Sequence, residues 1–205
     1  MIGIVDYGLG NIKAFANVYG KLNVPFIVAS KPDDLRTTSK IILPGVGAFD
    51  YAMDRLNESG MRKALDEMVL HQKVPVLGIC VGMQMLADSS EEGILPGLSW
   101  IEGEVKKFDP LTLAQSTHLP HMGWNDVKAV AKNNLLQGLE LNARFYFLHS
   151  YYFSCSKKEN ILAVTDYGGE FICAVNSGNV FGVQFHPEKS HQWGIQLLKN
   201  FAEME

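Results

Sequence analysis

The fold is decided by the stretch Val76-Leu77-Gly78-Ile79-Cys80-Val81-Gly82-Met83-Gln84. Its apolar run, 76–79, predicts a short buried strand, and residues 83–87 predict a helix that follows almost at once. Gly-x-Cys-x-Gly between a strand and a helix has the form of the nucleophile elbow, the strained turn that presents a serine in Gly-x-Ser-x-Gly hydrolases. Open α/β sheets bind ligands at the carboxyl ends of their strands. The stretch therefore predicts an α/β sheet with Cys80 at its ligand-binding edge.

The same pattern extends outward from the elbow. Short apolar runs alternate with helical stripes in the first half of the chain, which favours a parallel sheet covered on both faces. After Glu91 strand-like runs follow one another, so we expect an antiparallel portion there, and residues 176–179 suit a hairpin turn. We expect one domain, 1–205, with an open, mostly parallel, flavodoxin-like α/β sheet. The expected strands are 2–5, 25–29, 41–43, 76–79, 100–108, 125–130, 144–149, 161–166, 171–176 and 180–185, and the expected helices are 11–22, one from about 48, 60–71, 83–87 and 194–201.

Composition excludes several classes of function. The chain has 205 residues, 47% of them apolar, and a formal charge of -4 with scattered basic residues, so we expect no nucleic-acid partner. Three cysteines without metal or redox spacing argue against a disulfide-stapled secreted domain. No apolar run approaches the roughly 20 residues of a membrane span, and no signal peptide is evident. We expect a cytoplasmic protein without metal or cofactor.

Cys80 is the candidate nucleophile. A free thiol is only slightly ionised at neutral pH, but a helix start and a nearby imidazolium both favour the thiolate. The backbone N–H of Val81 is the natural first donor to a developing oxyanion. The alternative is that Cys80 is a small core residue, as buried cysteines usually are. For Cys155 and Cys173, which lack an elbow, the core interpretation is preferred.

His186 and Glu188 are the candidate base and its orienting acid, in the segment Phe185-His186-Pro187-Glu188-Lys189. Pro187 favours an extended backbone at His186. In an extended segment alternate side chains share a face, so Glu188 could orient the imidazole directly. His186 would take the thiol proton and return a proton to a leaving amine. His118 and His121 invite a zinc hypothesis, which we reject because no helix aligns them and no cysteine pair lies near.

With these residues together, the chain resembles the class I (triad) glutamine amidotransferases over nearly its whole length. The elbow and the His-Pro-Glu segment carry this resemblance. Within the class it is similar to the glutaminase subunits of imidazole glycerol phosphate synthases. The segments that carry this closer similarity are Asp6-Tyr7-Gly8-Leu9-Gly10-Asn11, Leu43-Pro44-Gly45-Val46-Gly47-Ala48-Phe49, Ser90-Glu91-Glu92-Gly93, Pro120-His121-Met122-Gly123-Trp124-Asn125 and Phe147-Leu148-His149-Ser150-Tyr151.

The resemblance implies a role for each of several residues. Cys80, with His186 and Glu188, would convert L-glutamine to glutamate and ammonia through a thioester. The second oxyanion donor would come from the backbone of the loop 44–47, at Val46 or Gly47. Two further sets of residues are implied: glutamine-binding residues Gly45, Gln84, His149, Ser150 and Tyr151, and partner-facing residues Asn11, Trp124, Tyr146 and Lys189.

The resemblance also implies a partner, a (β/α)8-barrel cyclase that uses the ammonia in histidine biosynthesis. Paralogous subunits feed ammonia to surface-sugar amidotransferases, and this chain departs from the usual pattern in three places. Gly97-Leu98-Ser99-Trp100-Ile101 replaces the more usual Gly-Leu-Gly-Leu-Ile, and residues 167–171 and 191–193 are atypical. Two further interpretations stay open: a cysteine hydrolase of another class, and a non-catalytic subunit that has kept the fold.

Overall fold

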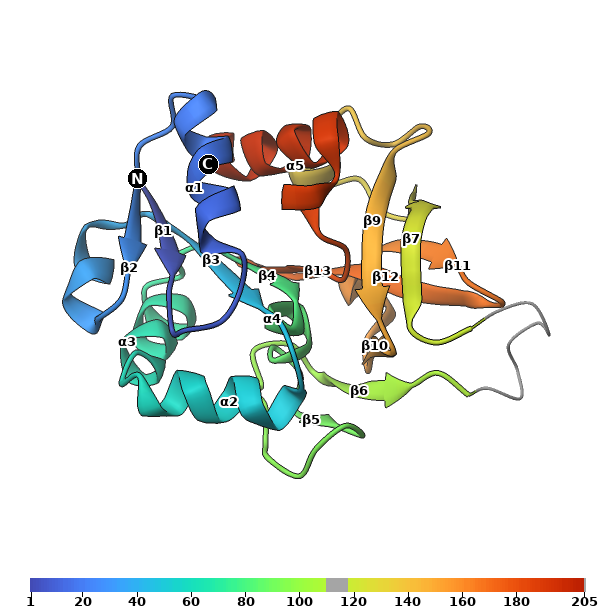
Figure 1. Ribbon diagram of the computed structural model, residues 1–205, viewed down its shortest axis with the longest axis horizontal. Coiled ribbons are helices and arrows are strands. Elements are labelled where there is room, and N and C mark those ends of the chain that lie inside the picture. Colours follow the sequence, from blue (N-terminus) through green and yellow to red (C-terminus); the bar gives the residue numbers. More distant parts are fainter. Residues whose placement is uncertain (110–117, 205) are drawn as a thin grey trace.

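The computed structural model describes residues 1–109 and 118–204, and it has a mixed α/β architecture (Figure 1). An eight-stranded sheet runs in the order β2-β1-β3-β4-β13-β12-β11-β8. Its first five strands are parallel, and the last three pair antiparallel. In that order the strands are Phe26–Ala29, Ile2–Val5, Lys40–Gly45, Val76–Cys80, Val180–Val183, Glu170–Ser177, Ile161–Asp166 and Lys128–Ala129.

Helices cover both faces of the parallel part. Helices α1 and α5 lie on one side of it, and α2 and α3 lie on the other (Figure 1). In α1 the buried side chains are Phe15 and Tyr19, four residues apart, which is the spacing that places them on one helix face. The helices are α1 Ile12–Lys21, α2 Phe49–Glu58, α3 Arg62–Asp66, α4 Val81–Gln84 and α5 His191–Glu203, and the shorter helical turns are Pro32–Thr37, Glu67–His71, Asn134–Leu136, Lys158–Asn160 and Pro187–Lys189.

Two smaller sheets extend the second half. Strands β7 and β9 form an antiparallel ribbon in which His121 is paired with His149. Strand β10 pairs with β6, and β5 joins the other side of β6. These strands are β5 Ser89–Ser90, β6 Gly103–Lys107, β7 His121–Asp126, β9 Arg144–His149 and β10 Tyr151–Cys155.

The expected fold class is confirmed, with local corrections. The helix expected over 60–71 changes to a π turn at Glu67, and the strand expected at 125–130 begins instead at His121 and is interrupted at Val127. The prediction that the His-Pro-Glu segment is extended throughout is wrong. His186 is extended, but Pro187 begins a 3-10 turn that ends at Lys189. Since proline suits the first turn of a helix, this turn is compatible with the sequence.

The sheet order determines where the site lies. Strands β3, β4 and β13 are adjacent and parallel, so their carboxyl ends meet at one edge. Cys80 ends β4, opposite Gly45 on β3, and the chain that leaves β13 reaches His186 three residues after Val183. Among the described residues no helix is long and apolar enough to cross a membrane.

Candidate active site

Cys80 sits in a strained turn that three glycines make possible. Its φ of 56° and ψ of -116° lie in a region that side-chain-bearing residues rarely adopt. A β-carbon on Gly82 would lie 2.0 Å from the carbonyl oxygen of Leu43, and one on Gly45 would lie 2.4 Å from the Gly82 nitrogen. A β-carbon on Gly78 would be similarly close, at 2.6 Å, to the Gly82 carbonyl oxygen. The backbones of β3 and the elbow therefore touch, and this contact holds Cys80 at the sheet edge.

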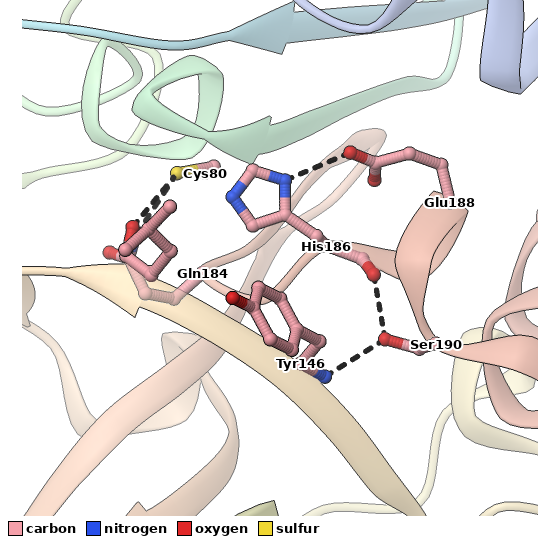
Figure 2. Close-up of polar contacts among 7 residues, drawn as sticks. Cys80, Tyr146, Gln184, His186, Glu188 and Ser190 are labelled. Carbon is pink, nitrogen blue, oxygen red and sulfur yellow. Dashed lines mark hydrogen bonds and ion pairs between the residues drawn. The ribbon is translucent and has the colours of Figure 1, made fainter. Parts of the chain in front are cut away.

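His186 faces the sulfur from the end of β13, and Glu188 lies behind its ring (Figure 2). The distance from His186 Nδ1 to Glu188 Oε1 is 2.9 Å, and both side chains are buried. Ser190 fixes the backbone of this turn: its hydroxyl donates to the His186 carbonyl over 2.6 Å and accepts from the Tyr146 N–H over 2.9 Å. The predicted base and acid thus meet, but through a 3-10 turn and not through an extended segment.

The charge on His186 is set by its two partners. Burial alone would lower the pKa of the imidazole. Its interactions with Cys80 and Glu188 outweigh burial and raise this pKa to about 10. At neutral pH the ring is therefore an imidazolium between a sulfur and a carboxylate. That state suits a thiolate nucleophile, and it supplies the proton that a leaving amine needs.

Gln184 is a site residue that the sequence analysis missed. It is fully buried, and its Nε2 lies 3.9 Å from Cys80 Sγ, while the sulfur lies 3.9 Å from the carbonyl oxygen of Leu148 (Figure 2). Its amide oxygen accepts a hydrogen bond of 3.0 Å from Gln84 Nε2. The period of two along a strand offered a signal, since Gln184 precedes His186 by two residues.

A cavity of about 300 Å³ opens over the sulfur. Of the residues expected to bind glutamine or the oxyanion, all but Gly45 line this cavity. Gly45 lies beneath the elbow instead. Lys189, expected to face a partner, also reaches the cavity. The lining residues are Val46, Gly47, Cys80, Val81, Gln84, Glu92, Pro120, Leu148, His149, Ser150, Tyr151, His186 and Lys189.

Glu92 is a charged residue of the cavity lining to which the sequence analysis gave no role. Its carboxylate accepts from the N–H of Phe49 over 2.9 Å at the start of α2. Burial raises the pKa of Glu92, the hydrogen bond from Phe49 lowers it, and the charge of Asp50 raises it again, with a net upward shift. The residue lies in the Ser-Glu-Glu-Gly segment that contributed to the family resemblance, and that position was the available signal.

His149 borders the cavity and is paired with His121. The distance from His121 Nδ1 to His149 Nε2 is 3.0 Å, and His149 Nδ1 lies 2.7 Å from the Tyr151 carbonyl oxygen. Burial lowers the pKa of His149 to about 3 and that of His121 to about 4. Both rings are therefore neutral. Over the described residues, no group of three or more His, Cys, Asp or Glu side chains is arranged to hold a metal ion.

Three of the four expected partner-facing residues share one surface. Trp124 and Tyr146 lie edge to face at 6.3 Å, and the Lys189 ammonium lies 5.7 Å from the Tyr146 ring centre. Trp124 is 40% exposed and also stacks on His191 at 5.2 Å. The fourth, Asn11, is exposed just before α1.

Known proteins share both the sequence and the fold of this chain. The family model "Glutamine amidotransferase class-I" matches residues 3–204. Proteins named "Imidazole glycerol phosphate synthase subunit HisH" are 61% identical in Bdellovibrio bacteriovorus and 54% identical in Leptospira interrogans, each over 204 residues that cover 100% of both chains. A glutamine amidotransferase from Thermotoga maritima shares the fold, with a TM-score of 0.63, 18% identity, and coverage of 91% of this chain and 75% of that one. The chain belongs to the class I glutamine amidotransferase family.

Proposed function

We propose that the chain is the glutaminase subunit of an imidazole glycerol phosphate synthase. It hydrolyses L-glutamine and delivers the ammonia to a (β/α)8-barrel cyclase in histidine biosynthesis. The observation that carries this proposal is that Cys80 and His186 line one cavity, while Glu188 lies 2.9 Å behind the His186 ring. Full-length similarity to the HisH subunits supports the pathway, and the family match over 3–204 supports a single domain over 1–205.

The first half-reaction releases ammonia. The Cys80 thiolate attacks the side-chain carboxamide carbon of glutamine, and the carbonyl oxygen becomes an oxyanion. The Val81 N–H and a backbone N–H of Val46 or Gly47 stabilise that charge. The His186 imidazolium gives its proton to the nitrogen, the C–N bond breaks, and a γ-glutamyl thioester remains.

The second half-reaction restores the enzyme. His186, now neutral, takes a proton from a water molecule that attacks the thioester carbon. The C–S bond breaks, the thiolate leaves, and glutamate is released. Glu188 keeps its contact with Nδ1 and holds the imidazole in position, as the acid of a catalytic triad does.

The cavity lining suits the two charged groups of glutamine. The carboxylate of Glu92 supplies a negative charge for the α-ammonium group, and the nearby backbone of Ser150 and Tyr151 offers hydrogen-bonding groups. Gln84 has both hydrogens of its amide in use, toward the Tyr151 carbonyl at 3.2 Å and toward Gln184, so its oxygen is the group left for substrate.

The exposed aromatic surface around Trp124 is the proposed docking site for the cyclase. Ammonia in neutral water is mostly protonated and diffuses away, so its acceptor must bind next to the cavity. Tyr146 and Lys189 connect this surface with the cavity, since Lys189 lines the cavity and covers the Tyr146 ring. Exposed aromatic side chains are typical of protein interfaces.

Of the atypical sequence features, one lies within the proposed docking surface and another does not. Ser99 takes a left-handed φ of 53°, the conformation that glycine adopts most readily, and Trp100 Nε1 donates to Asp66 over 2.8 Å. Both are local adjustments of the fold, and neither involves a residue of the Trp124 surface. His191 instead stacks on Trp124, within the proposed docking surface. Of these atypical positions, His191 is therefore the one placed to contact the acceptor.

The test is to mix the purified chain with a histidine-pathway barrel cyclase and measure product formation with glutamine or with ammonia. We expect Cys80→Ala to abolish glutamine-dependent synthesis and to leave ammonia-dependent synthesis intact. If the chain hydrolyses glutamine but forms no product with this cyclase, the acceptor of the ammonia belongs to a different pathway. The absence of glutamate release even with the cyclase present would refute the proposed chemistry.

A further inference from the structure

A chain of hydrogen bonds ends at Gln184. The side chain of Gln184 lies next to the Cys80 sulfur (Figure 2). Gln184 Nε2 faces the sulfur at 3.9 Å, and its oxygen accepts from Gln84 Nε2 at 3.0 Å. The second hydrogen of Gln84 Nε2 goes to the Tyr151 carbonyl at 3.2 Å. Because Gln84 donates both of its hydrogens, turning over its amide would face oxygen toward oxygen, and turning over the Gln184 amide would face one NH2 group toward the other.

The Tyr151 carbonyl is fixed from its other side. It accepts from His149 Nδ1 at 2.7 Å, so the proton of this neutral ring lies on Nδ1 and its Nε2 is an acceptor. His121 Nδ1 donates to that Nε2 at 3.0 Å, and Asn125 Nδ2 lies 3.4 Å from His121 Nε2. The protons of both imidazole rings are therefore on Nδ1, and each ring accepts at Nε2.

The direction of the contact between Gln184 Nε2 and the Cys80 sulfur has a chemical consequence. An N–H aimed at sulfur stabilises the thiolate more than the thiol, because the hydrogen bond becomes charge-assisted. The Leu148 carbonyl, also 3.9 Å from the sulfur, can only accept and so favours the thiol. Gln184 is fully buried, and a hydrogen bond is electrostatically stronger there than in water.

We propose that Gln184 positions and activates the nucleophile. Its side-chain N–H holds the Cys80 sulfur and favours its ionised form, and the contacts from Gln84 and Tyr151 keep the amide turned that way. This role deepens the proposed function, since it concerns the same sulfur, but it can be tested without glutamine.

The test is the pH dependence of Cys80 alkylation by iodoacetamide in the full chain, with the modified peptide identified by mass spectrometry. Gln184→Met preserves the length of the side chain and removes the N–H. We expect the pH of half-maximal alkylation to rise by about one unit. At any pH well below this midpoint, the alkylation rate of Cys80 would then be about tenfold lower. The matched control is Asn200→Leu, which removes a buried amide that donates to Leu135 and Gln137 and leaves the contacts of Cys80 unchanged.

A second variant keeps the test decisive if Gln184→Met does not fold. Gln84→Met leaves Gln184 in place but removes the donor that orients it, so we expect a smaller upward shift. An alkylation profile that matches the unmodified chain in the folded variants would overturn the proposal. If the variants show the expected shifts but the unmodified chain has no glutaminase activity with a cyclase, the proposed function fails while the role of Gln184 stands.

Discussion

His186 and His149 border the same cavity, both are buried, and their pKa values shift in opposite directions. The pKa of His186 is raised to about 10, whereas that of His149 is lowered to about 3. Burial disfavours the charged ring in both cases. The difference lies in the partners, since His186 lies between Cys80 and Glu188, while His149 meets a backbone carbonyl and the neutral ring of His121.

This difference separates two regions with different tasks. The end of the parallel sheet holds a charged imidazole that can give up and take back a proton. The ribbon of β7 and β9 holds a neutral pair that can only fix the direction of hydrogen bonds. The proposed reaction draws on both, because a proton donor is useful only when the substrate and the sulfur are held in place.

The largest expected effect comes from removing the acid that distinguishes His186. Glu188→Gln keeps the shape of the side chain but removes its charge, so the imidazolium loses its stabilising partner. We expect kcat for glutamine hydrolysis to fall by roughly 10⁴-fold, as when the acid of a triad is neutralised. Glutamate release in the presence of the cyclase measures it. Glu203→Gln, in an exposed pair with Lys199, is the control, and a loss below tenfold for Glu188→Gln would contradict the role of the carboxylate.

A second change separates the contribution of the thiolate from that of the acid. Cys80→Ala removes the other partner that raises the pKa of His186, so this pKa should fall from about 10 by about two units. NMR titration of the imidazole signals measures the shift. His149 serves as an internal reference in the same spectra, because its pKa should remain low. An unchanged His186 titration would show that Cys80 does not interact with the ring.

The smallest effect tests the neutral histidine. The folded-state pKa of His149 is below its unfolded value of about 6.5, so the unfolded chain binds the proton more readily and stability falls as the pH drops below about 6.5. Between pH 7 and pH 5 this should cost about 2 kcal/mol. His149→Asn keeps a nitrogen donor near the position of Nδ1 but cannot take up the proton. Its free energy of unfolding, measured with urea, should therefore fall by about 2 kcal/mol less between pH 7 and pH 5. His71→Asn, at an exposed position, should behave as the unmodified chain does, and equal losses in all three proteins would count against a neutral His149.

Sequence patterns predicted the parallel half of the fold well because its strands are buried on both faces. Strand β4 is buried at all five of its positions, and such a run is recognisable without knowledge of its neighbours. Strand β10 was missed because its alternation is weak, and only Phe153 is fully enclosed. Its pairing with β6 comes from a contact between distant segments, which local pattern cannot indicate.

The candidate site shows the same division. Cys80 was predicted because the elbow is a local motif that contains Gly78 and Gly82, although the third glycine that permits the turn, Gly45, comes from β3. Gln184 reaches the Cys80 sulfur and Glu92 reaches the cavity from separate segments, so their contribution depends on how the strands are assembled. The pairing of His121 with His149 likewise follows from the register of β7 and β9. Side-chain chemistry could be read along the chain, but hydrogen-bond direction could not.

The central claim is that Cys80 is the residue that takes the glutamyl group. The most direct measurement is mass spectrometry of the chain after acid quenching during turnover of glutamine with the cyclase present. A γ-glutamyl thioester should appear on the peptide that contains Cys80, and it should be absent from Cys80→Ala. Glutamate accumulation in Cys80→Ala, or a glutamyl adduct on a different residue, would contradict the account.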